Sequence, residues 1–216
     1  MNIMRKLTQR RLTNARKPTG RVGRFLIRAM NIRHSQMTNW GLSHLSIGKQ
    51  DTILDIGCGG GGTVHELAKI ATNGKVYGVD FSDESVMVSR MTNRRLVQMG
   101  HVEIQQSSVS CLPFSDSMFD LVTAVNTHNY WPDLVADMQE ILRVLKPDGK
   151  LIIIGSVYEG GKYDKRSQKY VEMIEIAFPS IKELHELFLR SGYTEVQMFE
   201  KCDRGWMCGI GRKPLE

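Results

Sequence analysis

Acidic residues are absent from the first 50 positions of this 216-residue sequence, and the first of them is Asp51. The same 50 positions hold eleven lysines and arginines. The remaining 166 residues carry eighteen basic and twenty-three acidic side chains, which is a net charge of −5. The overall charge of +6 is therefore an average over a basic N-terminal section and a mildly acidic body.

Long apolar segments are also missing. No run approaches the ~18 residues that a membrane-spanning helix needs, and the N-terminus lacks the uninterrupted hydrophobic stretch of a secretory signal. The cysteines at positions 58, 111, 202 and 208 form no C-x-x-C pair, and their spacing fits neither a zinc site nor a disulfide framework. We therefore expect no transmembrane segment, no metal and a reducing, cytoplasmic location.

The basic section has two parts. Residues 1–19 are polar, basic and aperiodic, which is typical of a poorly ordered arm. In residues 20–33 apolar side chains recur at helical spacing, with arginines on another face, so this part is predicted to be a basic amphipathic helix. The expected division is a flexible arm over 1–19, a helical segment over 20–50 and a single domain over 51–216.

Strands and helices alternate from residue 51 onward, without internal repeats or low-complexity tracts. This alternation predicts an α/β fold with a doubly wound, mostly parallel, Rossmann-like sheet. The last two strands are joined by a polar turn at Asp203–Gly205, so they form an antiparallel hairpin, because a parallel pair needs a long crossover. The expected strands cover 52–57, 75–82, 102–108, 119–126, 150–157, 194–201 and 205–213, and the expected helices cover 62–71, 83–100, 132–145, 164–178 and 180–191.

A glycine-rich turn follows the first expected strand. Residues 55–62 read DIGCGGGG, and five of the six positions from Gly57 to Gly62 are glycine. Such a turn lets a ligand approach bare backbone at the carboxyl edge of the sheet. Asp80, at the end of the second strand, suits a ribose diol because its carboxylate can accept hydrogen bonds from both hydroxyls. The pattern predicts a nucleotide-like cofactor.

Two cofactors fit this pattern at first. Gly57-x-Gly59-x-x-Gly62 matches the dinucleotide fingerprint, and Asp80 lies at the appropriate spacing beyond it. Other features favour a different cofactor. Asp55 precedes the first glycine by two residues, where a carboxylate could face a cation, and a Leu-Pro-Phe loop opens the phrase LPFSDSMFDLV before the fourth strand. The C-terminal hairpin is the third such feature.

Five segments of the sequence resemble the class I S-adenosylmethionine-dependent methyltransferases. They are ILDIGCGGG, VYGVDFS, LPFSDSMFDLV, LRVLKPDGKLII and SIKELHELFLRSGYTEV, and in this order they extend the likeness over roughly residues 50–213. The closest likeness is to the subgroup of quinone biosynthesis and small-metabolite methylation. The resemblance implies a seven-stranded sheet with an antiparallel seventh strand, the cofactor over the glycine turn, and a substrate entering from the far side.

The resemblance also implies roles for individual residues. Asp55 would face the methionine moiety, Asp80 would hold the ribose, and Phe81 would pack on the adenine. Close family members often carry an acid where this chain has Ser108, so the contact with the adenine amino group is expected to be weaker. The expected cofactor-binding set is Asp55, Gly57, Cys58, Gly59, Asp80, Phe81, Ser108, Val109 and Asn126.

The acceptor side is expected after the fourth strand, where residues 126–131 read NTHNYW. This text departs from the Asn-Pro-Pro-aromatic signature of adenine and amide methyltransferases, so that activity does not carry over. His128 is the candidate general base and Tyr130 a second catalytic candidate. Trp131 either walls the acceptor pocket or packs on the next helix. A leading helix commonly covers the cofactor in this class, which makes Trp40 a further candidate wall.

The sequence thus predicts an enzyme of class EC 2.1.1.- that transfers a methyl group in line from S-adenosylmethionine to a small molecule. The protein would mainly position and desolvate the reactants, and a base is needed only for a protonated acceptor. Two rivals stay open: an RNA methyltransferase that uses the basic arm, and a non-catalytic cofactor-binding partner subunit. The arm itself could be merely solvated, or bind RNA or an anionic surface, and the helix after it could lie on a membrane or cover the active site. We expect the arm to carry solvated charge and the helical segment to be a lid.

Overall fold

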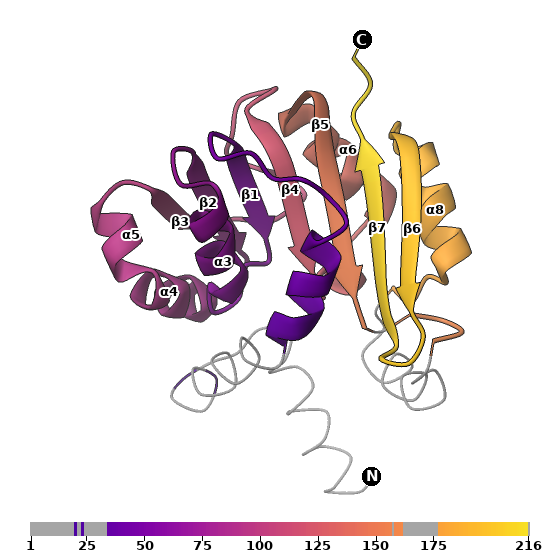
Figure 1. Ribbon diagram of the computed structural model, residues 1–216, viewed down its shortest axis with the longest axis horizontal. Helices are drawn as coiled ribbons and strands as arrows, with labels where there is room; N and C mark the ends of the chain where they lie inside the picture. Colours follow the sequence, from indigo (N-terminus) through magenta and orange to yellow (C-terminus); the bar gives the residue numbers. More distant parts are fainter. Residues whose placement is uncertain (1–19, 21–22, 24–33, 157, 162–176, 216) are drawn as a thin grey trace, which may run out of the picture.

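The computed structural model describes residues 20, 23, 34–156, 158–161 and 177–215. Within them, seven strands form one sheet in the order β3-β2-β1-β4-β5-β7-β6 (Figure 1). The strands are β1 (Thr52–Ile56), β2 (Lys75–Asp80), β3 (Val102–Gln106), β4 (Phe119–Val125), β5 (Leu145–Gly155), β6 (Thr194–Lys201) and β7 (Trp206–Arg212). The labelled helices are α3 (Gly62–Ile70), α4 (Asp83–Thr92), α5 (Arg94–Gln98), the 3₁₀ helix η1 (His128–Tyr130), α6 (Leu134–Val144) and α8 (Ile181–Arg190).

Pairing within the sheet confirms the expected fold. β1 to β5 pair in parallel, whereas β7 runs antiparallel to both β5 and β6. Strand order reverses between β1 and β4, because β1 leads to β2 on one side and β4 lies on the other. The carboxyl ends of these two strands therefore flank the crevice where open α/β sheets bind ligands.

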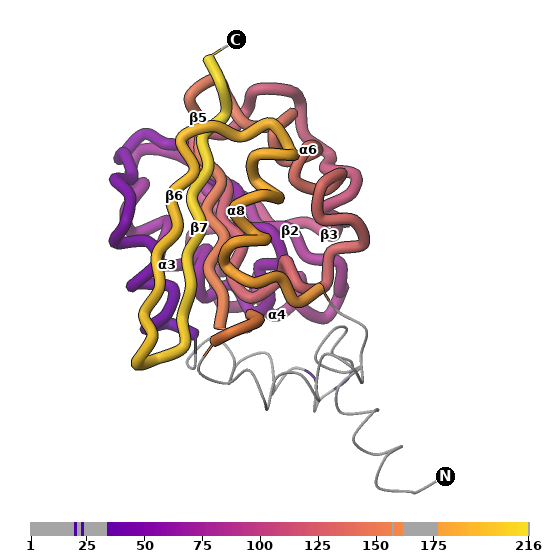
Figure 2. Tube along the Cα trace, turned by 90° about the vertical axis from the view of Figure 1, so that its right-hand side faces the viewer, coloured from indigo at the N-terminus to yellow at the C-terminus, as the bar shows by residue number. Residues whose placement is uncertain are grey.

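Helices cover both faces of the sheet, and each face has its own apolar core. On one face α6 and α8 pack through Met138, Ile141 and Phe188, and Figure 2 shows α8 beside the β6–β7 hairpin. On the other face lie α3 and a helix over residues 34–42, which crosses in front of β5 in Figure 1. That helix approaches the sheet closely, since a Cβ on Gly41 would lie 2.4 Å from Ile154 Cδ1.

Element boundaries differ from the sequence prediction in two places with clear causes. The helix expected over 83–100 is divided into α4 and α5 at Asn93, whose buried side chain donates hydrogen bonds to Gly61 O (3.0 Å) and Ser89 O (3.1 Å). The helix expected from residue 132 begins at Leu134, because Asp133 accepts hydrogen bonds from the N–H groups at the start of α6.

The expected arm over 1–19 lies outside the described residues, as does almost all of the helix expected over 164–178. Of the amphipathic segment 20–33, only Gly20 and Gly23 are described.

Candidate functional site

The glycines of the turn after β1 have different surroundings. A Cβ on Gly57 would lie 2.2 Å from Thr127 Oγ1, and a Cβ on Gly61 would lie 2.4 Å from Ser89 Oγ. These two positions lack a side chain because other parts of the chain pack against them. Gly59 differs, since a Cβ there would meet nothing nearer than Gly57 O at 4.0 Å. Of these three glycines, therefore, Gly59 is the one that leaves open space above the turn.

Asp80 holds the turn in place from the end of β2. Its Oδ2 accepts a hydrogen bond from Gly59 N–H (2.8 Å), and its Oδ1 accepts one from Ser82 N–H (2.9 Å). Burial raises the pKa of Asp80, and the two backbone hydrogen bonds oppose that rise. Each carboxylate oxygen has capacity for a further hydrogen bond. Asp80 can therefore anchor the turn and still accept hydrogen bonds from a diol.

Asp55 lies at the base of the same crevice and is only 2% exposed. Thr123 Oγ1 donates a 2.6 Å hydrogen bond to its Oδ1. Burial raises the pKa of Asp55 to about 7, the Thr123 hydrogen bond opposes this, and the nearby Asp80 adds to it. A carboxyl group in this state gains a favourable interaction when a cation arrives, because the cation stabilises its ionised form. The position suits an ammonium group.

Cys58 contributes to the turn through its backbone. Its N–H donates to Val79 O at 2.9 Å, so the N–H groups of Cys58 and Gly59 are both used within the protein. Its side chain is buried, with Sγ 3.7 Å from Ser89 Oγ. Burial, together with the negative charges of Asp80 and Asp55, raises the pKa of the Cys58 thiol well above its ordinary value. The thiol is therefore held neutral and is a poor nucleophile.

Beyond β2 and β3 lie the residues predicted to meet an adenine. Phe81 follows Asp80 and is 59% exposed, and Gln106 Nε2 donates a 3.0 Å hydrogen bond to its carbonyl. Ser108 Oγ accepts a 3.2 Å hydrogen bond from Ser110 N–H, while Val109 is buried in the core. An exposed phenyl ring thus follows Asp80 in sequence, directly after the carboxyl end of β2.

Asn126 joins three segments at the carboxyl end of β4. Its Oδ1 accepts a 2.9 Å hydrogen bond from Ser156 N–H after β5, and its Nδ2 lies 3.3 Å from Nε2 of His34 at the start of the 34–42 helix. Its φ is +53°, a left-handed conformation that asparagine tolerates better than most residues. Thr127 follows and packs on Gly57, so Asn126 lies next to the glycine turn.

Three buried nitrogen atoms in and after η1 have no hydrogen-bond partner among the described residues. They are Nδ1 and Nε2 of His128, which is 0% exposed, and Nε1 of Trp131, which is 7% exposed. Burial lowers the pKa of His128 to about 4. Its Cε1 would lie 3.1 Å from a Cβ on Gly155, which places the ring against the end of β5. Buried polar atoms in folded proteins are normally hydrogen-bonded, to other protein groups or to ordered water, so a polar ligand would give these three atoms partners.

Tyr130 and Trp40 have separate surroundings. Tyr130 is half-buried in η1. The indole of Trp40 lies in an aromatic group, with its centroid 5.0 Å from the His44 ring and 6.0 Å from the Trp206 ring. The structure therefore brings Asn126, His128 and Trp131 together after β4, while Trp40 lies over β7 on the opposite side of β5.

Both described ends of segment 20–34 lie near the glycine turn. Gly20 N–H donates a 3.2 Å hydrogen bond to Glu84 Oε1 in the first turn of α4, which follows β2. His34 meets Asn126 at the end of β4. Because β1 lies between β2 and β4, the two anchor points are on opposite sides of the turn that follows β1.

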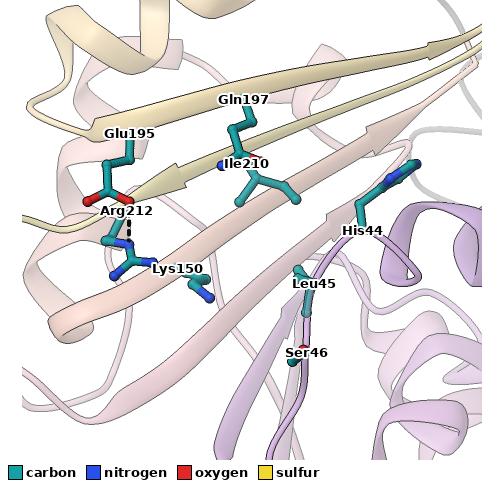
Figure 3. Close-up of a pocket in the computed structure, with 8 residues that line it drawn as sticks. All are labelled: His44, Leu45, Ser46, Lys150, Glu195, Gln197, Ile210 and Arg212. Carbon is teal, nitrogen blue, oxygen red and sulfur yellow. Dashed lines mark ion pairs between the residues drawn. The ribbon is translucent and has the colours of Figure 1, made fainter.

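A cavity of about 260 Å³ lies elsewhere, over β5, β6 and β7 beside residues 44–46 (Figure 3). Its charged groups include Lys150 and an ion pair in which Arg212 Nε is 3.2 Å from Glu195 Oε2. None of the predicted site residues lines it. Among the described residues there is neither a cluster of potential metal ligands nor a helix long and apolar enough to cross a membrane.

Comparison with known proteins extends the likeness over most of the chain. A family profile described as a methyltransferase domain matches residues 47–192. The demethylmenaquinone methyltransferase of Oceanobacillus iheyensis is 26% identical over an alignment of 189 positions that covers 77% of this chain and 79% of the relative.

Two solved structures have the same fold. A methyltransferase of Haloferax volcanii, solved with the Trm112 methyltransferase activator, matches with a TM-score of 0.78 and 21% identity over 87% of this chain and 93% of its own. Geranyl diphosphate C-methyltransferase of Streptomyces coelicolor, solved with S-adenosyl-L-homocysteine, matches with a TM-score of 0.70 and 17% identity. That match covers 83% of this chain and 76% of the other.

Proposed function

Because the chain belongs to the class I S-adenosylmethionine-dependent methyltransferases, we propose that it methylates a small-molecule acceptor whose reacting atom lies next to Asn126 and His128. S-adenosylmethionine supplies a methyl group on a sulfonium, which is already an excellent leaving group. The protein therefore has to bind, orient and desolvate the reactants, and it needs no nucleophile of its own. The neutral thiol of Cys58 agrees with that requirement.

One observation carries the cofactor half of the proposal: Gly59 opens on free space while its N–H is held by Asp80, and Asp55 lies close enough to Asp80 for the charge of Asp80 to raise its pKa. We assign Asp80 to the ribose diol and Asp55 to the methionine ammonium group. Phe81 would cover the adenine ring, with Ser108 and Val109 at the adenine edge. Since the N–H groups of Cys58 and Gly59 are already used, the turn would contribute shape more than donors.

The acceptor half rests on the three unpartnered nitrogens of His128 and Trp131. A hydroxyl on the acceptor could donate to the unprotonated nitrogen of His128 and accept from an N–H of either ring, whereas a carbonyl oxygen could only accept. The flat rings of Tyr130 and Trp131 suit an apolar or aromatic molecule. A pKa of about 4 makes His128 a weak base that is neutral near pH 7. We propose that it accepts the proton of the acceptor where the reaction releases one. Trp40 stays a candidate wall of the pocket.

Segment 20–50 is proposed to close the site. Its two described anchors, Gly20 on Glu84 and His34 beside Asn126, belong to segments on either side of β1, which supports this proposal. The arm over 1–19 is proposed to carry solvated charge, and 51–216 to form the catalytic domain. The cytoplasmic location predicted from the sequence stays a prediction.

The test has two stages. Titration calorimetry of the full chain with S-adenosylmethionine and, separately, with NAD⁺ is expected to give binding for the first alone. Incubation with methyl-labelled cofactor and a metabolite extract, followed by mass spectrometry, is expected to find one or a few labelled small molecules. Label found only in added RNA, and lost when residues 1–19 are deleted, would instead favour the RNA methyltransferase.

A further inference from the structure

Large exposed apolar side chains recur on α4 and just after α5, and one more follows β2. Phe81, Met87, Met91 and Met99 are 59%, 40%, 57% and 78% exposed, although they are large and apolar. Among the described residues the other exposed large apolar side chains are Ile70, Leu189 and Leu215, which lie on α3, on α8 and near the C-terminus. A local concentration of this kind on a protein surface commonly marks an interaction site.

The geometry of α4 places two of these methionines together. The inward face of α4 consists of Ser85, Val86, Val88 and Ser89, which are buried. Met87 and Met91 are four residues apart and face away from that buried side, so their side chains lie one turn apart on the solvent face. Thioether side chains are flexible and polarisable, and they adapt to irregular apolar environments.

Arginines flank the methionines. Arg94 and Arg95 are exposed at the start of α5, and Arg90 donates hydrogen bonds from Nε and Nη2 to Ile104 O. Among the described residues no carboxylate forms an ion pair with these three arginines. Their charge is therefore available to an anionic partner. Met87, Arg90, Met91, Arg94, Arg95 and Met99 are called the α4–α5 surface below.

The residue that follows the basic N-terminal sequence contacts the same helix. The hydrogen bond from Gly20 N–H to Glu84 Oε1 fixes residue 20 to the first turn of α4. The 19 residues before it contain six lysines and arginines and no acid. A basic stretch of sequence therefore precedes the residue that is hydrogen-bonded to α4. Figure 1 places α4 at the end of the sheet to which the arrowheads of β1, β4 and β5 point, the end that holds the glycine turn.

We propose that the α4–α5 surface docks the enzyme on membranes that contain anionic phospholipids. The arginines of this surface provide attraction to anionic headgroups, and the exposed methionines can enter the boundary between headgroups and acyl chains. An RNA would use the same positive charge, but it would leave the apolar side chains of α4 and α5 in water. The methionines therefore favour the lipid surface. The inference goes beyond the proposed function and does not depend on the acceptor's identity.

Vesicle flotation of the full chain tests the proposal. At low ionic strength the wild-type protein is expected to float with vesicles of phosphatidylglycerol and phosphatidylcholine, and at least about tenfold less with phosphatidylcholine alone. The double variant Met87→Ser/Met91→Ser is expected to lose about tenfold in partitioning, and Arg94→Gln/Arg95→Gln a similar amount. The matched control, Ile70→Ser/Leu189→Ser, removes two other exposed apolar side chains and is expected to float like the wild type.

Thermal unfolding and S-adenosylmethionine affinity should be the same in all variants, because none of these residues belongs to the proposed site. Failure of the wild-type protein to float with anionic vesicles would overturn the proposal. So would a methionine variant that floats as well as the wild type. A nucleic acid would be the partner instead if the protein bound single-stranded RNA tightly and this binding weakened steeply with salt. The RNA would also have to displace vesicles and bind the methionine variant as well as the wild type.

Discussion

Gly57 and Thr127 are packed so closely that a Cβ on Gly57 would lie 2.2 Å from Thr127 Oγ1 and 2.7 Å from its Cβ. Gly57 belongs to the turn after β1, and Thr127 begins the segment that leads from β4 into η1. The cofactor side and the acceptor side of the proposed site are therefore in direct contact. A shift of either segment would displace the other, because there is no free volume between the packed atoms.

This contact separates the roles of two glycines. Gly57→Ala is expected to destabilise the fold by about 2–3 kcal/mol, because the new methyl group clashes with Thr127 and φ is left-handed. Gly59→Val also carries backbone strain, because φ at Gly59 is +50°, but it creates no clash within the fold, and it is expected to abolish S-adenosylmethionine binding. Urea unfolding and calorimetry measure the two effects. Normal cofactor binding by Gly59→Val would mean that the open space is not the cofactor site.

Asp80→Ala is expected to weaken S-adenosylmethionine binding by about 10–100-fold, the usual worth of lost hydrogen bonds to a charged group. The variant loses the proposed contact with the ribose and also the anchor of Gly59 N–H. Asp83→Ala is the matched control, because Asp83 is an exposed carboxylate three residues away in α4. Equal dissociation constants for the wild type and Asp80→Ala would remove Asp80 from the site.

Asp55 predicts how pH affects binding and stability. Burial raises the pKa of Asp55 in the folded chain to about 7, above the ordinary value of 3.8. Between these values the folded chain binds more protons than the unfolded chain, so this residue makes the free energy of unfolding fall as pH rises from about 4 to 7. A bound ammonium group favours the ionised form of Asp55, so binding becomes easier as the carboxyl group loses its proton. The affinity for S-adenosylmethionine is therefore expected to rise with pH over the upper part of that range. Asp55→Asn should flatten both profiles, measured by urea unfolding and calorimetry from pH 5 to 8.

The sequence was sufficient for the sheet but not for the detailed work of the turn. The alternation of strands and helices predicts a doubly wound sheet, and this prediction does not depend on which side chains lie at the ligand-binding edge. The short Asp203–Gly205 turn requires an antiparallel hairpin. The glycine run, by contrast, does not reveal which glycines face a ligand. Gly57 and Gly61 pack on Thr127 and Ser89, which are distant in sequence, so only the tertiary structure distinguishes them from Gly59.

The α4 boundary shows the same limit. Helical spacing continues through residues 83–100, yet Asn93 turns inward to the carbonyl of Gly61 and divides the helix. The sequence around Asn93 does not indicate that its side chain has a hydrogen-bond partner more than 30 residues away. The burial of His128 was equally hidden, because a histidine in NTHNYW gives no sign of how much of the ring is covered. Residue types at the site were predictable from the sequence, whereas their hydrogen-bond partners and pKa values were not.

His128 gives the opposite pH effect on stability from Asp55. Burial lowers the pKa of His128 to about 4 from 6.5, so between these values the unfolded chain binds the extra proton. Its contribution to stability is complete above pH 6.5 and is lost as pH falls toward 4. His128→Phe, which keeps an aromatic ring without a titratable group, is expected to unfold less steeply with acid than the wild type. Urea unfolding between pH 4 and 7 measures the difference, and identical acid slopes would contradict it.

The role of His128 in catalysis can be measured separately from its role in stability. If its imidazole takes a proton from the acceptor, His128→Ala should lower the single-turnover rate of methyl transfer by about 10²–10⁴-fold, with cofactor affinity little changed. The wild-type rate should fall on an acid limb near pH 4 and not near the ordinary histidine pKa, because the buried ring is neutral down to that pH.

His128→Gln is the companion variant, since glutamine can hydrogen-bond to an acceptor oxygen but cannot take its proton. Loss of rate in both variants, with thermal unfolding above the assay temperature, would support proton transfer. Full activity in His128→Gln with loss only in His128→Ala would assign the residue to orienting the acceptor. If the rates of both variants stay within about threefold of wild type, His128 takes no part in catalysis. The rest of the site would then act only by positioning the reactants.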